Sequence, residues 1–229
     1  MEKQIDFNGE WSNEYDDTAQ HIIPAYQAIY ELGHHLLREQ VGAEAKILVA
    51  GAGTGKEIID WSQNNPHWSF TGVDPAGPML SIAQQKVEAA SYGDRISFVH
   101  GLIEDVTETD FDAATAILVM QFLKDDGEKL EFLRGIADRL KPGAPVILVD
   151  LEGEIGSDEY NILNAAWKNH QFFKRDDSSR VRKEFVMREK EVRFIPSVRI
   201  ESLLEEAGCI KIHRFFKAYL FGGYVAVKK

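Results

Sequence analysis

Three glycines follow an apolar run in the first quarter of the chain, and this stretch constrains the fold more than any other. The run at residues 47–50 reads Ile-Leu-Val-Ala, and Gly51, Gly53 and Gly55 follow it. An amphipathic helical pattern begins directly afterwards. Glycine permits a positive φ and a close approach of the backbone to a ligand, and the start of a helix offers free N–H groups. The order strand, glycine turn, helix therefore predicts a nucleotide-cofactor site in an α/β sheet.

Three cofactor classes use such a turn, and the spacing of the glycines separates them. A P-loop requires a glycine separated from Gly-Lys by four residues and a Ser or Thr after the lysine, but this chain has Ala50 and Glu57 at those positions. The dinucleotide fingerprint Gly-x-Gly-x-x-Gly would place its third glycine at Lys56. The observed Gly-x-Gly-x-Gly spacing resembles motif I of the class I S-adenosylmethionine (SAM) methyltransferases. The turn alone is also compatible with a purely structural role.

An acidic residue ends the second predicted strand, residues 68–74. Asp74 lies 23 positions after Gly51, and an acidic residue about 20 positions past the glycine turn can accept both hydroxyls of a nucleotide ribose. The alternative is a helix cap, because Asp74-Pro75 precedes the next helical pattern. We expect the ribose role.

Apolar periodicity predicts alternating helices and strands along the chain. Predicted helices cover about residues 18–40, with Pro24 near a helix start, and 54–64, 75–90, 127–140 and 198–207. Predicted strands cover about residues 46–50, 68–74, 96–100, 113–119, 146–151, 210–216 and 221–227. The last two are joined by a short link and must be antiparallel. The pattern predicts a Rossmann-like, doubly wound α/β sheet of seven strands, mostly parallel with an antiparallel C-terminal hairpin. One domain, 1–229, would carry an N-terminal helical cap (1–40) and a lid insertion (153–195).

Composition limits the class of protein. The one cysteine, Cys209, allows no internal disulfide. No apolar run reaches the roughly 18 residues of a membrane span, and the N-terminus lacks a signal-peptide pattern, so we expect a cytoplasmic enzyme without a membrane partner. The net charge of −11 makes a nucleic-acid partner unlikely, because binding phosphates requires clustered Lys and Arg.

Residues 153–195 differ in composition from the rest of the chain. From Lys168 to Arg193 there are nine cations and five acids, a net charge of +4. Residues 153–195 also hold Trp167, His170, Phe172 and Phe173. One interpretation is a solvated lid whose aromatic residues pack on the sheet, and the other is an anion-attracting wall over the active site. The sequence leaves both open.

Two pairs of carboxylates lie at or after the ends of predicted strands. Asp125 and Asp126 would cap the helix that begins near residue 127, although paired carboxylates also suit Mg²⁺. We expect the capping role and no metal. Asp150 and Glu152 would share one face of their strand, because strand side chains alternate.

The order of the elements resembles the class I SAM methyltransferases over about residues 40–229. The chain is similar in particular to the carboxy-SAM synthase and the related tRNA wobble-uridine methyltransferase-like group. The stretches that carry the resemblance are Val73-Asp74 with Met79, Leu-Val-Met-Gln-Phe-Leu at 118–123, Leu-Lys-Pro-Gly at 140–143, Phe-Lys-Arg at 173–175 and Phe-Gly-Gly-Tyr-Val-Ala at 221–226.

The chain departs from the resembled family at three positions. Motif I of that family has an acidic residue that orients the cofactor ammonium where this chain has Val49, so backbone carbonyls would have to replace it. After the third strand, Leu102 stands where an Asp is frequent in the family. The lid arginine of the synthase, which pairs with the extra carboxylate, aligns with Val186.

The resemblance also implies a set of site residues. The glycines would border the methionine part of SAM, Asp74 the ribose, and Met79 with residues 102 and 103 the adenine. The predicted cofactor-binding residues are Ala50, Gly51, Gly53, Gly55, Asp74, Pro75, Met79, Leu102, Ile103 and Met120. The candidates for a catalytic base are Tyr15 and His170, and each of these residue types is also common in purely structural roles.

The predicted function is SAM-dependent methyl transfer to a small-molecule acceptor, aromatic-bearing or anionic, by in-line attack on the sulfonium methyl. The alternatives are a carboxy-SAM synthase-like reaction, a tRNA wobble-uridine-modifying enzyme and a non-catalytic SAM-binding module. For the synthase, the resemblance implies a heavier SAM adduct after addition of prephenate. The sequence leaves open whether the protein forms a homodimer.

Overall fold

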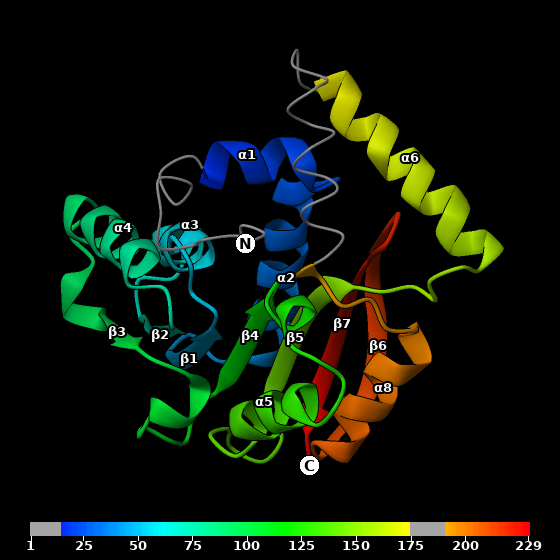
Figure 1. The fold of residues 1–229 in the computed structure, drawn as a ribbon. Helices are drawn as coiled ribbons and strands as arrows, with labels where there is room; N and C mark the ends of the chain where they lie inside the picture. The colour runs from blue at the N-terminus through cyan, green and yellow to red at the C-terminus, as the bar shows by residue number, and fades with distance from the viewer. Residues whose placement is uncertain (1–14, 175–190) are drawn as a thin grey trace.

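The computed structural model describes residues 15–174 and 191–229, and a seven-stranded sheet runs through them (Figure 1). Its spatial order is β3-β2-β1-β4-β5-β7-β6. The strands are β1 (Ala45–Ala50), β2 (Trp68–Asp74), β3 (Ile96–His100), β4 (Ala113–Ile117), β5 (Pro145–Leu151), β6 (Cys209–Ala218) and β7 (Phe221–Lys228). β7 pairs antiparallel with β5 and β6, and the other pairs are parallel. The predicted fold class is confirmed. The strand order reverses between β1 and β4, where a doubly wound sheet binds its ligand.

Helices cover both faces of the sheet. The described α-helices are α1 (Tyr15–Ile22), α2 (Tyr26–Gln40), α3 (Lys56–Asn64), α4 (Gly77–Ala89), α5 (Glu128–Ala137), α6 (Asp158–Lys174) and α8 (Ser197–Glu206). Short 3-10 turns are η2 (Gly93–Arg95), η3 (Ile103–Asp105) and η4 (Met120–Phe122). Side chains alternate along β1, so Ile47 and Val49 join the core under α2, α3 and α4, while Leu48 and Ala50 join the core under α5 and α8.

Two predicted elements differ from the observed ones. The helix predicted over 18–40 is two helices, because Pro24 has no N–H to continue the first one and Ala25 takes a left-handed φ of 55° before α2 begins. The strand predicted over 113–119 ends at Ile117. Leu118 has a φ of 63°, which is outside the extended region and turns the chain into η4.

The N-terminal and lid helices lie on the same side of the sheet. Figure 1 shows α1 above the sheet, between α3 and α6. The indole Nε1 of Trp167 on α6 donates to the carbonyl oxygen of Ile22 at 2.8 Å, and the Trp167 ring packs edge-on against Phe221. Trp167 is therefore an anchor that joins the predicted lid to the N-terminal helices and to the sheet.

The rest of the predicted lid is only partly described. Val186 and the cations from Arg175 to Lys190 lie outside the described residues, as do the side chains of Phe173 and Lys174. The anion-attracting wall stays a prediction for that reason. Within residues 15–174 and 191–229, no helix is long and apolar enough to cross a membrane.

Candidate active site

A cleft of about 830 Å³ opens beyond the carboxyl ends of β1, β2 and β4. Its lining combines the glycine turn, the turns after β2, β3 and β4, and one face of α5. The lining residues are Tyr15, Gly51, Gly53, Val73, Asp74, Pro75, Ala76, Met79, Gly101, Leu102, Ile103, Glu104, Ile117, Leu118, Val119, Phe122, Leu123, Glu128, Glu131, Phe132 and Gly135. The cleft thus lies at the reversal of strand order.

The glycine turn has a conformation that other residues adopt only with strain. Gly51, Gly53 and Gly55 have φ values of 78°, 50° and 77°, a region that favours glycine. A Cβ on Gly51 would lie 2.2 Å from Cγ2 of Val119, so the turn after β4 presses directly on it. The N–H groups of Gly51 and Ala52 both donate to the carbonyl of Val73, at 2.8 and 3.0 Å. The turn is therefore held in one shape before any ligand binds.

Asp74 joins the glycine turn to the start of α4. Its Oδ2 accepts the N–H of Gly53 at 2.9 Å, and its Oδ1 accepts the N–H of Ala76 at 2.8 Å. Burial raises the pKa of the Asp74 carboxyl, and the two N–H groups partly offset that rise. Each oxygen keeps acceptor capacity, and the residue lines the cleft. Asp74 therefore combines a local turn role with a position suited to ligand hydroxyls.

The charges on the cleft wall favour a cationic ligand. Among the described residues that line the cleft, four are carboxylates and none is Lys, Arg or His. The four are Asp74, Glu104, Glu128 and Glu131. A wall of one sign attracts the opposite charge, so a sulfonium cofactor suits this cleft better than a nucleotide diphosphate.

Most of the predicted cofactor residues meet at this cleft. The lining includes seven of the ten, namely Gly51, Gly53, Asp74, Pro75, Met79, Leu102 and Ile103. The other three are Ala50, Gly55 and Met120. Ala50 and Met120 are fully buried in the core, and Gly55 is the residue before α3.

The two predicted catalytic residues are not brought together at the cleft. Tyr15, at the start of α1, lines it. His170 is not among the residues that line it. The His170 ring on α6 lies 6.1 Å from the ring of Tyr219, in the turn between β6 and β7. The positions of Tyr15 and His170 in the sequence do not indicate that only Tyr15 lines the cleft.

The contribution of α5 to the cleft was not predicted from the sequence. Glu128, Glu131, Phe132 and Gly135 line the cleft from one face of that helix. The spacing at i, i+3, i+4 and i+7 was a signal for a shared face. The sequence of α5 does not indicate that this face lines the cleft, while the face with Leu133 is buried in the core.

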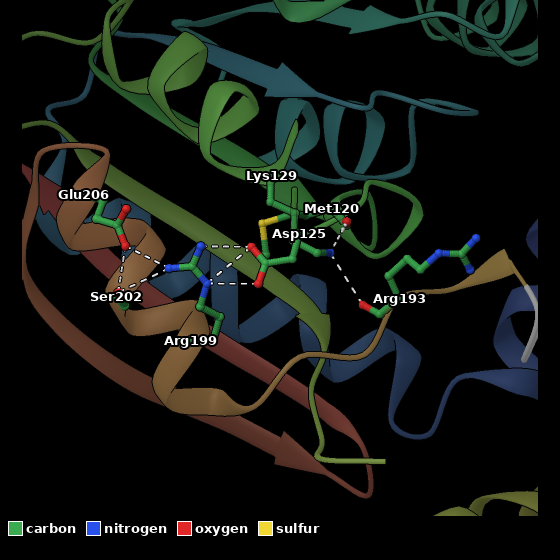
Figure 2. Close-up of polar contacts among 7 residues, drawn as sticks. All are labelled: Met120, Asp125, Lys129, Arg193, Arg199, Ser202 and Glu206. Carbon is green, nitrogen blue, oxygen red and sulfur yellow. Dashed lines mark hydrogen bonds and ion pairs between the residues drawn. The ribbon is translucent and has the colours of Figure 1, made fainter. Parts of the chain in front are cut away.

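The turn after β4 is held by buried polar contacts. The N–H of Leu118 donates to the carbonyl of Val149 at 2.7 Å. Figure 2 shows Nζ of Lys129 donating to the carbonyl of Met120 at 2.6 Å and reaching the carbonyl of Arg193 at 3.5 Å. The N–H of Arg193 in turn donates to the carbonyl of Gln121 at 2.7 Å. The cleft wall and the segment that leads into α8 are therefore one connected unit.

The capping role predicted for Asp125 is wrong. Figure 2 shows its carboxylate paired with the guanidinium of Arg199 on α8, with Nε at 2.9 Å from Oδ2. Arg199 also donates to Glu206 at 2.8 Å. The residue before α5 is Gly127, with no side-chain cap. Asp125 instead ties the loop before α5 to α8, because the two helices pack together on the same face of the sheet.

Two buried acids lie at the carboxyl end of β5. Glu152 is paired with Arg214 at 3.2 Å and bonded to Lys217 and Tyr224, so its charge is compensated. The Oδ1 of Asp150 accepts the N–H of Leu151 at 2.7 Å, and within the described part of the chain its Oδ2 has no hydrogen-bond partner. Burial raises the pKa of Asp150 to about 7, and Lys129 limits the rise.

The fold, the cleft and the similarity to known proteins together support a class I SAM-dependent methyltransferase with SAM as its cofactor. The family model described as "Methyltransferase domain" matches residues 48–146. That stretch runs from β1 into β5 and contains the glycine turn, Asp74 and the turn after β4.

Curated relatives agree with this class, and a solved structure shares the fold. The chain is 25% identical to a carboxy-S-adenosyl-L-methionine synthase from Desulfotalea psychrophila, over 99% of this chain and 93% of that protein. It is 31% identical to a ubiquinone/menaquinone biosynthesis C-methyltransferase from Geotalea daltonii, over 46% of this chain and 45% of that protein. The fold is similar to that of magnesium protoporphyrin IX methyltransferase from Synechocystis PCC 6803 with bound SAH, with a TM-score of 0.71, 15% identity and coverage of 97% and 96% of the two chains.

Proposed function

We propose that the protein transfers the methyl group of SAM to a small-molecule acceptor, by in-line attack of the acceptor on the sulfonium methyl. The observation that carries the proposal is the acid-lined cleft at the reversal of strand order, formed by a rigid glycine turn and by Asp74. The sulfonium methyl is already activated, so the main requirement is alignment of the acceptor. A volume of about 830 Å³ is near the upper end for small-ligand pockets, which supports a cofactor and an acceptor together.

We propose specific roles for the cofactor residues. Gly51 and Gly53 would border the methionine part, Asp74 would accept the ribose hydroxyls, and Met79 would pack against the adenine. Leu102 is 52% exposed, so a ligand that covers it would remove apolar surface from water. Leu102 and Ile103 would therefore form the other side of the adenine site.

The ammonium group of the cofactor requires hydrogen-bond acceptors. Position 49 is Val in this chain, so no acidic side chain supplies them there. The carbonyls of Ala50 and Gly51 are the proposed substitutes. The carbonyl of Met120 already accepts Lys129, which leaves it only its second lone pair. Gly55 would act indirectly, through the shape of the turn and the start of α3.

Tyr15 is the better placed of the two proposed catalytic residues, because it lines the cleft. Its hydroxyl would take a proton from the acceptor or orient it. His170 stays a proposal for the acceptor side, since α6 is joined to α1 through Trp167. We propose that residues 1–40 and 153–195 together form the acceptor side of a single domain.

A carboxy-SAM synthase-like reaction is the second candidate. Proteins of that name from Desulfotalea psychrophila and Campylobacter lari are each 25% identical to this chain, and their matches cover 99% and 100% of it. A match over the full length includes the cap and the lid, which would form the acceptor side. That observation favours the synthase over a tRNA-modifying enzyme and over a non-catalytic SAM-binding module.

Mass analysis of the products separates the two candidates. The protein is incubated with SAM and a metabolite extract, and in parallel with SAM and prephenate. Methyl transfer predicts enzyme-dependent release of S-adenosylhomocysteine from the extract. A heavier SAM adduct with prephenate would support the synthase instead, and SAM binding with no product in either reaction would favour a binding module. Sub-micromolar binding of tRNA in a filter-binding titration would instead support a wobble-uridine-modifying enzyme.

A further inference from the structure

Asp16 joins three elements beside the glycine turn of the cleft. Its Oδ1 accepts the hydroxyl of Thr54 at 2.5 Å, and its Oδ2 accepts Nζ of Lys86 at 2.5 Å. Lys86 also donates to the carbonyl of Thr54 at 3.0 Å. Asp16 lies on α1, Thr54 in the glycine turn and Lys86 on α4. One carboxylate therefore fastens the N-terminal helix to both the turn and the helix beside it.

The network is placed to affect the cofactor. Thr54 stands between the second and third glycines, and its side chain is only 3% exposed. Tyr15, the neighbour of Asp16, lines the cleft together with Gly51 and Gly53. A change in the contact of Asp16 with Thr54 would therefore move a residue of the cleft wall relative to the turn.

The far end of α1 connects to the predicted lid. The carbonyl of Ile22, its last residue, accepts the indole N–H of Trp167 on α6. Figure 1 shows α1 running between the region of α3 and α4 and the region of α6. α1 is thus held at one end by the cofactor turn and at the other by α6.

The bonds of this network differ in exposure. The side chains of Asp16 and Lys86 are each about one-third exposed, at 32% and 34%, so water can compete for the ion pair. The hydroxyl of Thr54 is buried. One bond of the network therefore has a buried donor, and the ion pair joins two side chains that are each about one-third exposed. We expect the hydrogen bond to Thr54 to hold α1 more firmly than the ion pair.

We propose that Asp16, Thr54 and Lys86 form a latch that holds α1 on the glycine turn, positions Tyr15 in the cleft and slows the release of SAM. These are positioning residues, because they act through the turn and through Tyr15. The latch couples occupancy of the cofactor site to α1 and, through Trp167, to α6. The inference depends only on SAM as the cofactor and is independent of the acceptor.

The test measures the rate of SAM release by stopped-flow displacement, with affinity from calorimetry and folding from thermal denaturation. Asp16→Asn and Thr54→Val each weaken the latch, while Thr54→Ser keeps the hydroxyl. Asp17→Asn removes one charge from an exposed neighbour on the same helix and is the matched control. We expect release to become about tenfold faster in Thr54→Val, because affinity differences appear mainly in dissociation rates. Asp16→Asn should have a smaller effect in the same direction, because its amide oxygen can still accept the hydroxyl of Thr54. Thr54→Ser and Asp17→Asn should stay close to the wild type.

Two further readouts separate a latch from a merely structural contact. Tyr15→Ala should speed release in the wild type and add little in the Thr54→Val background, since both changes act through one path. Hydrogen exchange should show that SAM protects the amides of α1 in the wild type and protects them less in Thr54→Val. Wild-type release rates in folded Asp16→Asn and Thr54→Val, or an equal effect of Asp17→Asn, would overturn the proposal.

Discussion

Nζ of Lys129 lies 2.6 Å from the carbonyl oxygen of Met120, although Lys129 is fully buried. A buried ammonium is costly unless it is bonded and paired. Burial lowers the pKa of Lys129, and the negative charge of Asp150 counteracts that effect. Met120 begins η4, the turn that carries cleft residues on both sides. The lysine therefore fixes the shape of the cleft wall from inside the core.

Replacing Lys129 by Met tests this relationship. The variant leaves the Met120 carbonyl without its donor and Asp150 without its cation, so the free energy of unfolding should fall by about 1–3 kcal/mol. SAM affinity should fall as well, because the wall loosens. Adding Asp150→Asn should recover part of the stability, since the uncompensated buried charge is gone. Denaturant titration measures both effects, and a Lys129→Met variant as stable as the wild type would contradict the assignment.

Gly51→Ala tests the close contact between the glycine turn and Val119 in the turn after β4. The new Cβ would need a left-handed φ, which costs roughly 1–2 kcal/mol, and would clash with Val119, which costs about 1–3 kcal/mol more. SAM binding should be lost with it. Gly143→Ala is the matched control, because Gly143 has a φ of 84° and nothing within 4 Å of an added Cβ.

The comparison of the two alanine variants isolates the clash. Gly143→Ala should show the backbone cost alone and keep SAM binding. Adding Val119→Ala to Gly51→Ala should restore part of the stability. If both glycine variants lost equal stability and both still bound SAM, close contact at Gly51 would have no role in the site.

Replacing Glu57 by Gln gives a pH prediction. Burial raises the pKa of Glu57 from 4.5 to about 7, so the folded state binds this proton more tightly than the unfolded state. The stability from that proton is complete below about pH 4.5 and is lost as pH rises through about 7. Ionised Glu57 therefore costs the wild type up to about 3 kcal/mol above pH 7.

Glu57→Gln removes this dependence and keeps an acceptor for the hydroxyl of Thr115, which donates to Glu57 at 3.4 Å. The variant should match the wild type near pH 4 and exceed it in stability at pH 8. Urea titrations at a series of pH values would show this. Parallel curves for the two proteins across pH 4–8 would rule out a titrating Glu57. Asp150, with a pKa raised to about 7, should leave a residual slope in both.

Asp74→Ala tests the ribose assignment. The carboxylate would make charge-assisted bonds to the ribose, so its loss should cost about 1.5–3 kcal/mol of SAM binding. Asp74→Asn keeps one acceptor oxygen and should lie between the wild type and the alanine variant. Thermal denaturation is the control, because the side chain also accepts the N–H of Gly53. SAM affinity within about twofold of the wild type in folded Asp74→Ala would exclude the ribose contact.

The features of the fold and of the cleft that were predictable from the sequence depend on local patterns. The glycine spacing and Asp74 depend on residues near one another along β1 and β2, and the structure places both at the cleft. Strand and helix order follows from periodicity, and the fold class is confirmed. The end of β4 was missed because nothing in its sequence indicates that Leu118 adopts a left-handed φ.

The remaining differences depend on tertiary contacts. Asp125 pairs with Arg199, 74 positions away in the chain, so a local capping rule could not predict its partner. The sequence analysis gave Lys129 no role, because lysine is almost never fully buried, yet its side chain is buried under the turn after β4. The separation of Tyr15 from His170 follows from how α1 and α6 pack, which periodicity does not specify.

Calorimetry of the wild-type protein with SAM and with NAD, under the same conditions, most directly tests whether the cleft is a SAM site. We predict one SAM site per chain and no heat from NAD, because four carboxylates and no described Lys, Arg or His line the cleft. Tight binding of NAD without binding of SAM would contradict this prediction.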